Sequence, residues 1–64
     1  MKIFVNGEER QTGAATLAAL LEEEGFGPAV ATAVNESFVA KAARAAIKLQ
    51  DGDRVEVLSA MQGG

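Results

Sequence analysis

The sequence of 64 residues contains no cysteine and no histidine. Their absence excludes disulfide bonds, a thiol nucleophile, an imidazole base and a zinc site of the usual kind. A chain of this length forms one domain, and it buries only about 60% of the surface that its unfolded form exposes. We therefore expect one domain of modest stability, with no metal site.

Basic residues and long apolar runs are also scarce. Nine acidic residues against six basic ones give a net charge of -3, which argues against sequence-independent binding to nucleic acid because such binding depends on Lys and Arg. The first apolar run covers only residues 3–5, whereas a signal peptide needs roughly 7–15. No stretch is long enough to span a membrane. We expect a cytoplasmic protein that binds neither nucleic acid nor membrane.

A β-hairpin is predicted at the N-terminus. Residues 2–5 are rich in strand formers, and Asn6-Gly7 is the dipeptide that best tolerates the positive φ angles of a type I′ turn. The returning strand covers residues 8–12, and its polar side chains suit an exposed sheet edge.

An amphipathic helix follows. Thr16 is a suitable N-cap, and three leucines recur at helical spacing after it: Leu17, Leu20 and Leu21. The helix should end at Gly25, with Phe26 against Leu21 as in a Schellman motif, and Gly27-Pro28 prevents its continuation.

The second half of the chain contains three more strands. Residues 30–34 alternate larger and smaller apolar groups, which is typical of a buried strand. The alanines of residues 41–47 favour a helical turn. The remaining expected elements are a turn at 35–37, a short strand at 38–39, a turn at Asp51-Gly52-Asp53 and a last strand at 54–58.

This order of elements predicts an α+β fold with one main helix on a mixed sheet of four to five strands. The expected domain covers residues 1–58, and residues 59–64 form a flexible tail that ends in Gly-Gly. Alternation along the strands places four residues on the face that meets the helical leucines: Ile3, Val5, Val55 and Val57.

Taken in order, several short motifs resemble the ThiS family, the thiamine-pathway sulfur carriers. They are Val5-Asn6-Gly7, Thr16-Leu17 with Leu20-Leu21, Ala33-Val34-Asn35, Val39 with Lys41, Asp51-Gly52-Asp53 and Gln62-Gly63-Gly64. The resemblance implies a ubiquitin-like β-grasp fold, with the first and last strands side by side and parallel. Two positions depart from the family pattern: Ala40 replaces a common proline, and Arg44 replaces a nearby aromatic residue.

The resemblance also implies a carrier and not an enzyme. A ubiquitin-activating-enzyme-like adenylyltransferase would use ATP to join the Gly64 carboxylate to AMP. A persulfide from a cysteine desulfurase or another donor would convert it into a thiocarboxylate, which passes its sulfur to a thiazole synthase. The carrier itself would bind no cofactor and would be monomeric when free.

The tail suits this chemistry, because glycine has little bulk and a nearly unrestricted φ, so Gly63 and Gly64 could enter a narrow channel. Six extended residues, which include Met61 and Gln62, reach roughly 20 Å. The alternative is that the two glycines are only a frayed or truncated end.

Two surfaces are candidate partner sites. Phe4 and Leu58 should point away from the helix and approach one another near the tail, as an apolar docking surface or as ordinary exposed residues. Glu22-Glu23-Glu24 is either an acidic docking patch or a solvated helix face. A third group, Lys41, Arg44 and Lys48, would share one side of a fully helical segment. These residues are either an anion or phosphate site or, as we interpret them, the solvated side of the segment.

Other functions remain open on the sequence alone. A carrier for molybdopterin or cysteine synthesis would use the same tail with a different acceptor. A β-grasp protein modifier or interaction module would use Gly64 for isopeptide bonds or not at all. A small hydrolase lacks the residues it needs, since no histidine can activate a serine or threonine.

Overall fold

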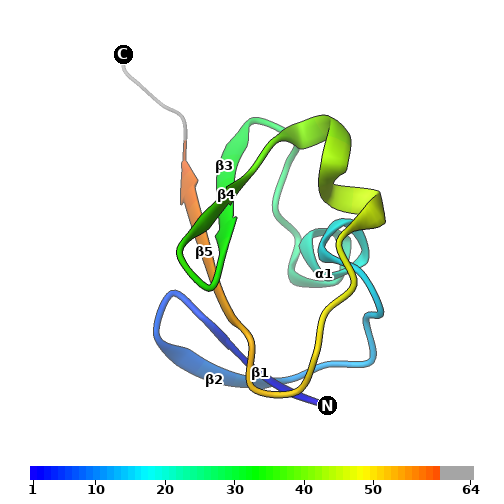
Figure 1. Ribbon diagram of the computed structural model, residues 1–64, viewed down its shortest axis with the longest axis vertical. Helices are drawn as coiled ribbons and strands as arrows, with labels where there is room; N and C mark the ends of the chain where they lie inside the picture. The colour runs from blue at the N-terminus through cyan, green and yellow to red at the C-terminus, as the bar shows by residue number, and fades with distance from the viewer. Residues whose placement is uncertain (60–64) are drawn as a thin grey trace.

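A computed structural model describes residues 1–59 and shows a five-stranded mixed sheet with its helices on one side (Figure 1). The strand order is β2-β1-β5-β3-β4, which confirms the predicted α+β class. No helix among these residues is long and apolar enough to cross a membrane. The elements are β1 (Lys2–Val5), β2 (Glu8–Gln11), α1 (Leu17–Glu24), β3 (Val30–Val34), β4 (Ser37–Val39), the 3-10 helix η1 (Lys41–Ala46) and β5 (Arg54–Ser59).

The first and last strands lie side by side at the centre of the sheet. Strand β1 pairs with β5 in parallel, with Phe4 opposite Arg54 and Val5 opposite Val55. The other pairs, β1 with β2, β3 with β4, and β3 with β5, are antiparallel. The parallel central pair that the resemblance implied is therefore present.

Two tight turns close the hairpins. Asn6 and Gly7 have φ angles of 52° and 84°, as a type I′ turn requires. The Asn6 side chain also extends the pairing of β1 with β5: its Nδ2 donates to the Val57 carbonyl at 3.1 Å, and its Oδ1 accepts from the Val57 N–H at 2.8 Å. The β3–β4 turn uses positive φ at Asn35 and Glu36.

Helix α1 has the predicted ends. The Thr16 hydroxyl accepts from the Ala19 N–H at 3.1 Å. At the other end Gly25 is left-handed, with a φ of 83°. The Phe26 N–H donates to the Leu21 carbonyl at 2.9 Å, and the Gly25 N–H donates to Glu22 at 3.1 Å, which is the hydrogen-bond pattern of a Schellman motif.

The core lies between α1 and the inner face of the sheet. All seven residues predicted for it are buried: Ile3, Val5, Leu17, Leu20, Leu21, Val55 and Val57. Val39, Leu49 and Ala14 complete the buried apolar cluster. The helix register predicted from the leucine spacing is therefore confirmed.

Residues 30–34 form a strand as predicted, but the strand is not buried along its whole length. Thr32 is buried, and Val30 and Val34 are partly buried against the core, because these three residues lie on the helix side of the sheet while Ala31 and Ala33 face the uncovered side. Larger and smaller residues alternate because the small residues of the strand lie on the outer face of the sheet. Strand β5 also runs through Ser59, one residue beyond its predicted end.

Candidate functional site

The end of strand β5 leads into the predicted tail. Ser59, the last described residue, lies opposite Val30 of β3. Strand β1 pairs only with Arg54 and Val55 of β5. The last residues of β5 are therefore paired with β3 alone. Four predicted site residues lie outside the described residues: Met61, Gln62, Gly63 and Gly64. Their role and the tail boundary stay predictions.

Phe4 and Leu58 belong to the face of the sheet opposite α1. Buried and less buried residues alternate along β1 and along the first part of β5, and Leu58 is 65% exposed. Phe4 is half-buried, and the Lys2 ammonium lies 5.7 Å from the centre of its ring. The predicted orientation of both residues is confirmed.

Phe4 and Leu58 do not meet, contrary to the expected approach. Phe4 lies opposite Arg54, and Leu58 lies four residues further along β5, a separation of about 13 Å along a strand. Each lines its own shallow hollow. The Phe4 hollow has a volume of about 300 Å³ and is also lined by Gly7, Arg54 and Glu56. The Leu58 hollow has a volume of about 100 Å³ and is also lined by Ala31, Ala33, Phe38 and Glu56.

The apolar neighbour of Leu58 is Phe38, which the sequence reasoning did not single out. Phe38 is 74% exposed and lies on β4, opposite Ala33 of β3. Strand alternation indicates the orientation of Phe38. Val39 belongs to the core, and neighbouring side chains of a strand point to opposite faces, so Phe38 points to the open face. We name the residues of this hollow the Leu58 surface: Leu58, Phe38, Ala31, Ala33 and Glu56.

The acidic residues at the end of α1 are partly engaged within the domain. Glu23 accepts a hydrogen bond from the Thr12 hydroxyl, and the Glu24 Oε1 lies 4.0 Å from the Arg10 Nε. Glu22 is exposed and lines a different hollow, beside η1. Two of the three carboxylates therefore have partners within the domain, and the docking role of Glu22, Glu23 and Glu24 stays a prediction.

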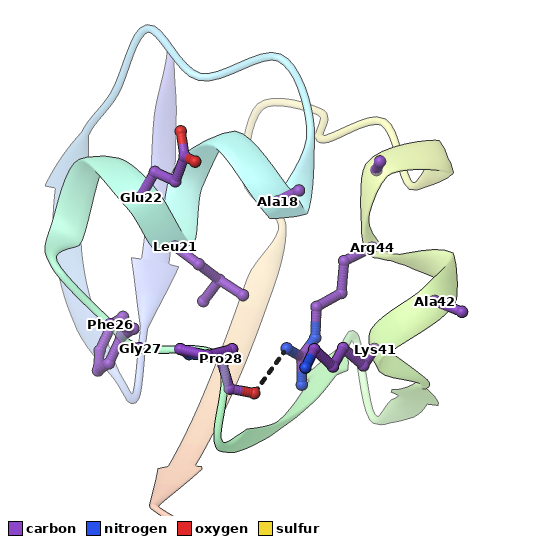
Figure 2. A pocket seen from close by; sticks show the side chains of 10 residues that line it. Ala18, Leu21, Glu22, Phe26, Gly27, Pro28, Lys41, Ala42 and Arg44 are labelled. Carbon is purple, nitrogen blue, oxygen red and sulfur yellow. Dashed lines mark hydrogen bonds between the residues drawn. The ribbon is translucent and has the colours of Figure 1, made fainter.

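The interpretation of Arg44 as a solvated residue is wrong. Arg44 is only 6% exposed, because η1 directs it toward β3 and the segment before it. Its Nε donates to the Thr32 hydroxyl at 3.0 Å, and its Nη2 donates to the Val30 carbonyl. Its Nη1 lies 3.5 Å from the Pro28 carbonyl, the contact drawn in Figure 2.

An open hollow of about 400 Å³ lies between α1, residues 26–28 and η1 (Figure 2). Its apolar residues include Leu21, Phe26 and Pro28, and its charged residues are Glu22, Lys41 and Arg44. Lys41 and Lys48 are exposed as predicted, but Lys48 does not line this hollow. The three cations are therefore in three different environments.

A mixed sheet with parallel first and last strands at its centre and one main helix across one face defines the ubiquitin-like β-grasp class. The model of the ThiS family matches residues 3–64. The chain therefore belongs to the ThiS family.

Two solved structures of Geobacter metallireducens proteins resemble the chain over its whole length. One is a crystal structure of a thiamine biosynthesis protein (ThiS), with 30% identity, a TM-score of 0.84 and full coverage of both chains. The other is a solution structure of a thiamine biosynthesis protein, with 30% identity, a TM-score of 0.80 and 88% coverage of that chain. No curated protein matches this chain.

Proposed function

We propose that this chain is a sulfur carrier in thiamine biosynthesis and a substrate of partner enzymes, not an enzyme itself. The observation that carries the proposal is the family match, which runs from residue 3 through the Gly63-Gly64 pair. The thiamine biosynthesis proteins that share its fold over its whole length support the same assignment.

The proposed reaction begins at the Gly64 carboxylate. A carboxylate is a poor electrophile, so an adenylyltransferase transfers AMP from ATP to it and releases pyrophosphate. The terminal sulfur of a cysteine persulfide, formed by a cysteine desulfurase or another donor, then displaces AMP to give an acyl disulfide. A thiol cleaves this disulfide, leaving a thiocarboxylate on Gly64 and a disulfide on the donor. A thiazole synthase takes the sulfur.

We propose that the adenylyltransferase docks on the open face of the sheet, against the Leu58 surface and Phe4. Support comes from position and exposure: Leu58 immediately precedes Ser59, at the end of β5, and both Leu58 and Phe38 expose most of their surface. A partner that covers this face would lie beside the start of the tail. A few well-packed residues at the desolvated centre of an interface commonly supply most of its binding energy.

Docking is tested by calorimetry with the adenylyltransferase. We expect Leu58→Ser or Phe38→Ser to weaken binding by about 1 kcal/mol or more, while each variant keeps its circular dichroism. Ala46→Ser is the matched control, since Ala46 is exposed on η1, at the other side of the sheet. Unchanged affinity in both variants would contradict docking on the Leu58 surface and turn attention to Glu22 at the end of α1.

The carrier function is tested by intact mass measurement of the protein recovered from its native host. We expect a fraction whose mass corresponds to the replacement of one oxygen by one sulfur. The second test is ATP–pyrophosphate exchange catalysed by the adenylyltransferase. One residue added after Gly64 should abolish exchange and leave the thermal melt unchanged, because it displaces the reactive carboxylate. Full exchange by the extended protein would refute the mechanism.

A further inference from the structure

The hollow between α1 and η1 combines an apolar wall with two cations. Leu21, Phe26 and Pro28 supply the apolar surface, and Lys41 and Arg44 both come from η1 (Figure 2). Its volume of about 400 Å³ falls within the range of small-ligand sites, about 300–1,000 Å³. The hollow lies on the helix side of the sheet, and the Leu58 surface lies on the other.

Arg44 is a buried cation whose hydrogen-bond partners among residues 1–59 are all neutral groups. A guanidinium has five N–H donors, and Thr32, Val30 and Pro28 accept three of them. Within residues 1–59 no carboxylate lies within 4.0 Å of it. Two of the five donors, one on Nη1 and one on Nη2, therefore have no acceptor within residues 1–59, and a carboxylate is the acceptor that arginine binds most strongly.

The charge of the hollow favours a single negative charge on that acceptor. Lys41 and Arg44 contribute two positive charges and Glu22 one negative charge, a local net charge of +1. A carboxylate balances this charge, whereas a doubly charged phosphate would exceed it and lie near the Glu22 carboxylate. The apolar wall in turn fits an apolar side chain next to the carboxylate.

We propose that this hollow binds an acidic peptide segment of a partner protein, with one Asp or Glu carboxylate on Arg44 and Lys41 and an adjacent apolar side chain against Leu21, Phe26 and Pro28. The carboxylate accepts from the remaining donors of Arg44 and neutralises a buried charge that has no carboxylate within 4.0 Å among residues 1–59. This second binding surface does not depend on the proposed sulfur-carrier function, because it uses neither the tail nor the open sheet face.

The probe is the peptide acetyl-Leu-Glu-Leu-amide, titrated to about 10 mM, the range in which a short peptide of weak affinity is detected. Binding is followed by NMR on the isotope-labelled full chain. We expect saturable shifts of the Arg44 Nε–H and of the backbone amides of Lys41, Ala42 and Leu21. The matched peptide acetyl-Leu-Gln-Leu-amide should bind at least about threefold more weakly, because it lacks the charge.

Charge variants of the protein locate the site. Lys41→Gln should weaken binding by about two- to fivefold, the effect of one partly exposed charge, and Glu22→Gln should strengthen it. Lys48→Gln is the matched control, because it removes the same charge outside the hollow and should change nothing. All three positions are exposed, so each variant should fold.

Four results of the peptide titrations would overturn the proposal. They are the absence of saturable shifts, equal binding of the two peptides, equal effects of Lys41→Gln and Lys48→Gln, and shifts confined to Phe38 and Leu58. Inorganic phosphate is the competing probe. Displacement of the acidic peptide by a lower concentration of phosphate would identify a phosphate site and refute a carboxylate site.

Discussion

Leu20→Ala is the most direct test of how this small domain is stabilised. Leu20 is fully buried at 0% exposure, in the middle of α1, within the cluster that joins the helix to the sheet. Loss of its side chain removes apolar contacts and leaves a cavity, at a cost of about 2–5 kcal/mol. At roughly 0.05–0.15 kcal/mol per residue, the whole chain of 64 residues has about 3–10 kcal/mol of stability.

The assay is urea unfolding followed by circular dichroism. Leu58→Ala is the matched control: the chemical change is identical, but Leu58 is 65% exposed, so its loss should cost below about 1 kcal/mol. If Leu20→Ala is unfolded outright, Leu20→Val gives a smaller cavity that can be measured. Equal free energies of unfolding for the two alanine variants would refute the assigned core.

Three further substitutions test the hydrogen bonds and turns of the domain. Asn6→Ala should cost about 1–3 kcal/mol in urea unfolding, because both Val57 backbone groups lose their partner; an unchanged midpoint would contradict this role. Gly25→Ala should lower the free energy of unfolding by about 1–2 kcal/mol. The φ angle of Gly25 is 83°, which strains a residue with a Cβ even though there is open space around the position. Gly25→Asn should lower it less. Arg44→Lys should lower the melting temperature, because an ammonium cannot reproduce the guanidinium fork; an unchanged melt would show that only its charge matters.

The sequence predicted the elements whose signals are local. Asn6-Gly7, the Thr16 cap and Gly25 each determine a backbone conformation within a few residues, and each behaves as expected. The core followed from two periodicities, three leucines at helical spacing and alternation in β1 and β5. These features could be read without knowing how distant segments meet.

Arg44 could not be predicted in this way, because its partners are 12 to 16 residues away in the sequence. Residues 41–46 contain no large apolar side chain. The aliphatic stem of Arg44 therefore fills the inward position, and its head group reaches acceptors on and before β3. The rule that charged residues lie on the surface fails where nothing apolar competes for the interior.

The Leu58 surface could be predicted only in part for a related reason. Alternation gives the face of each strand, and it placed Phe4 and Leu58 on the correct one. The neighbours within that face depend on register, which the sequence does not fix for the β1–β5 pair. The observed register separates Phe4 from Leu58 and brings Phe38 to Leu58 instead.

The position of β5 in the sheet connects the fold with the proposed carrier function. It is the last strand in the chain but the central strand of the sheet, and Val55 and Val57 are 1% and 4% exposed. The edge strand β2 exposes all four of its residues, so local opening should begin at such an edge and not at β5. The predicted tail therefore follows a strand whose first residues pair with both β1 and β3 and whose last residues pair with β3.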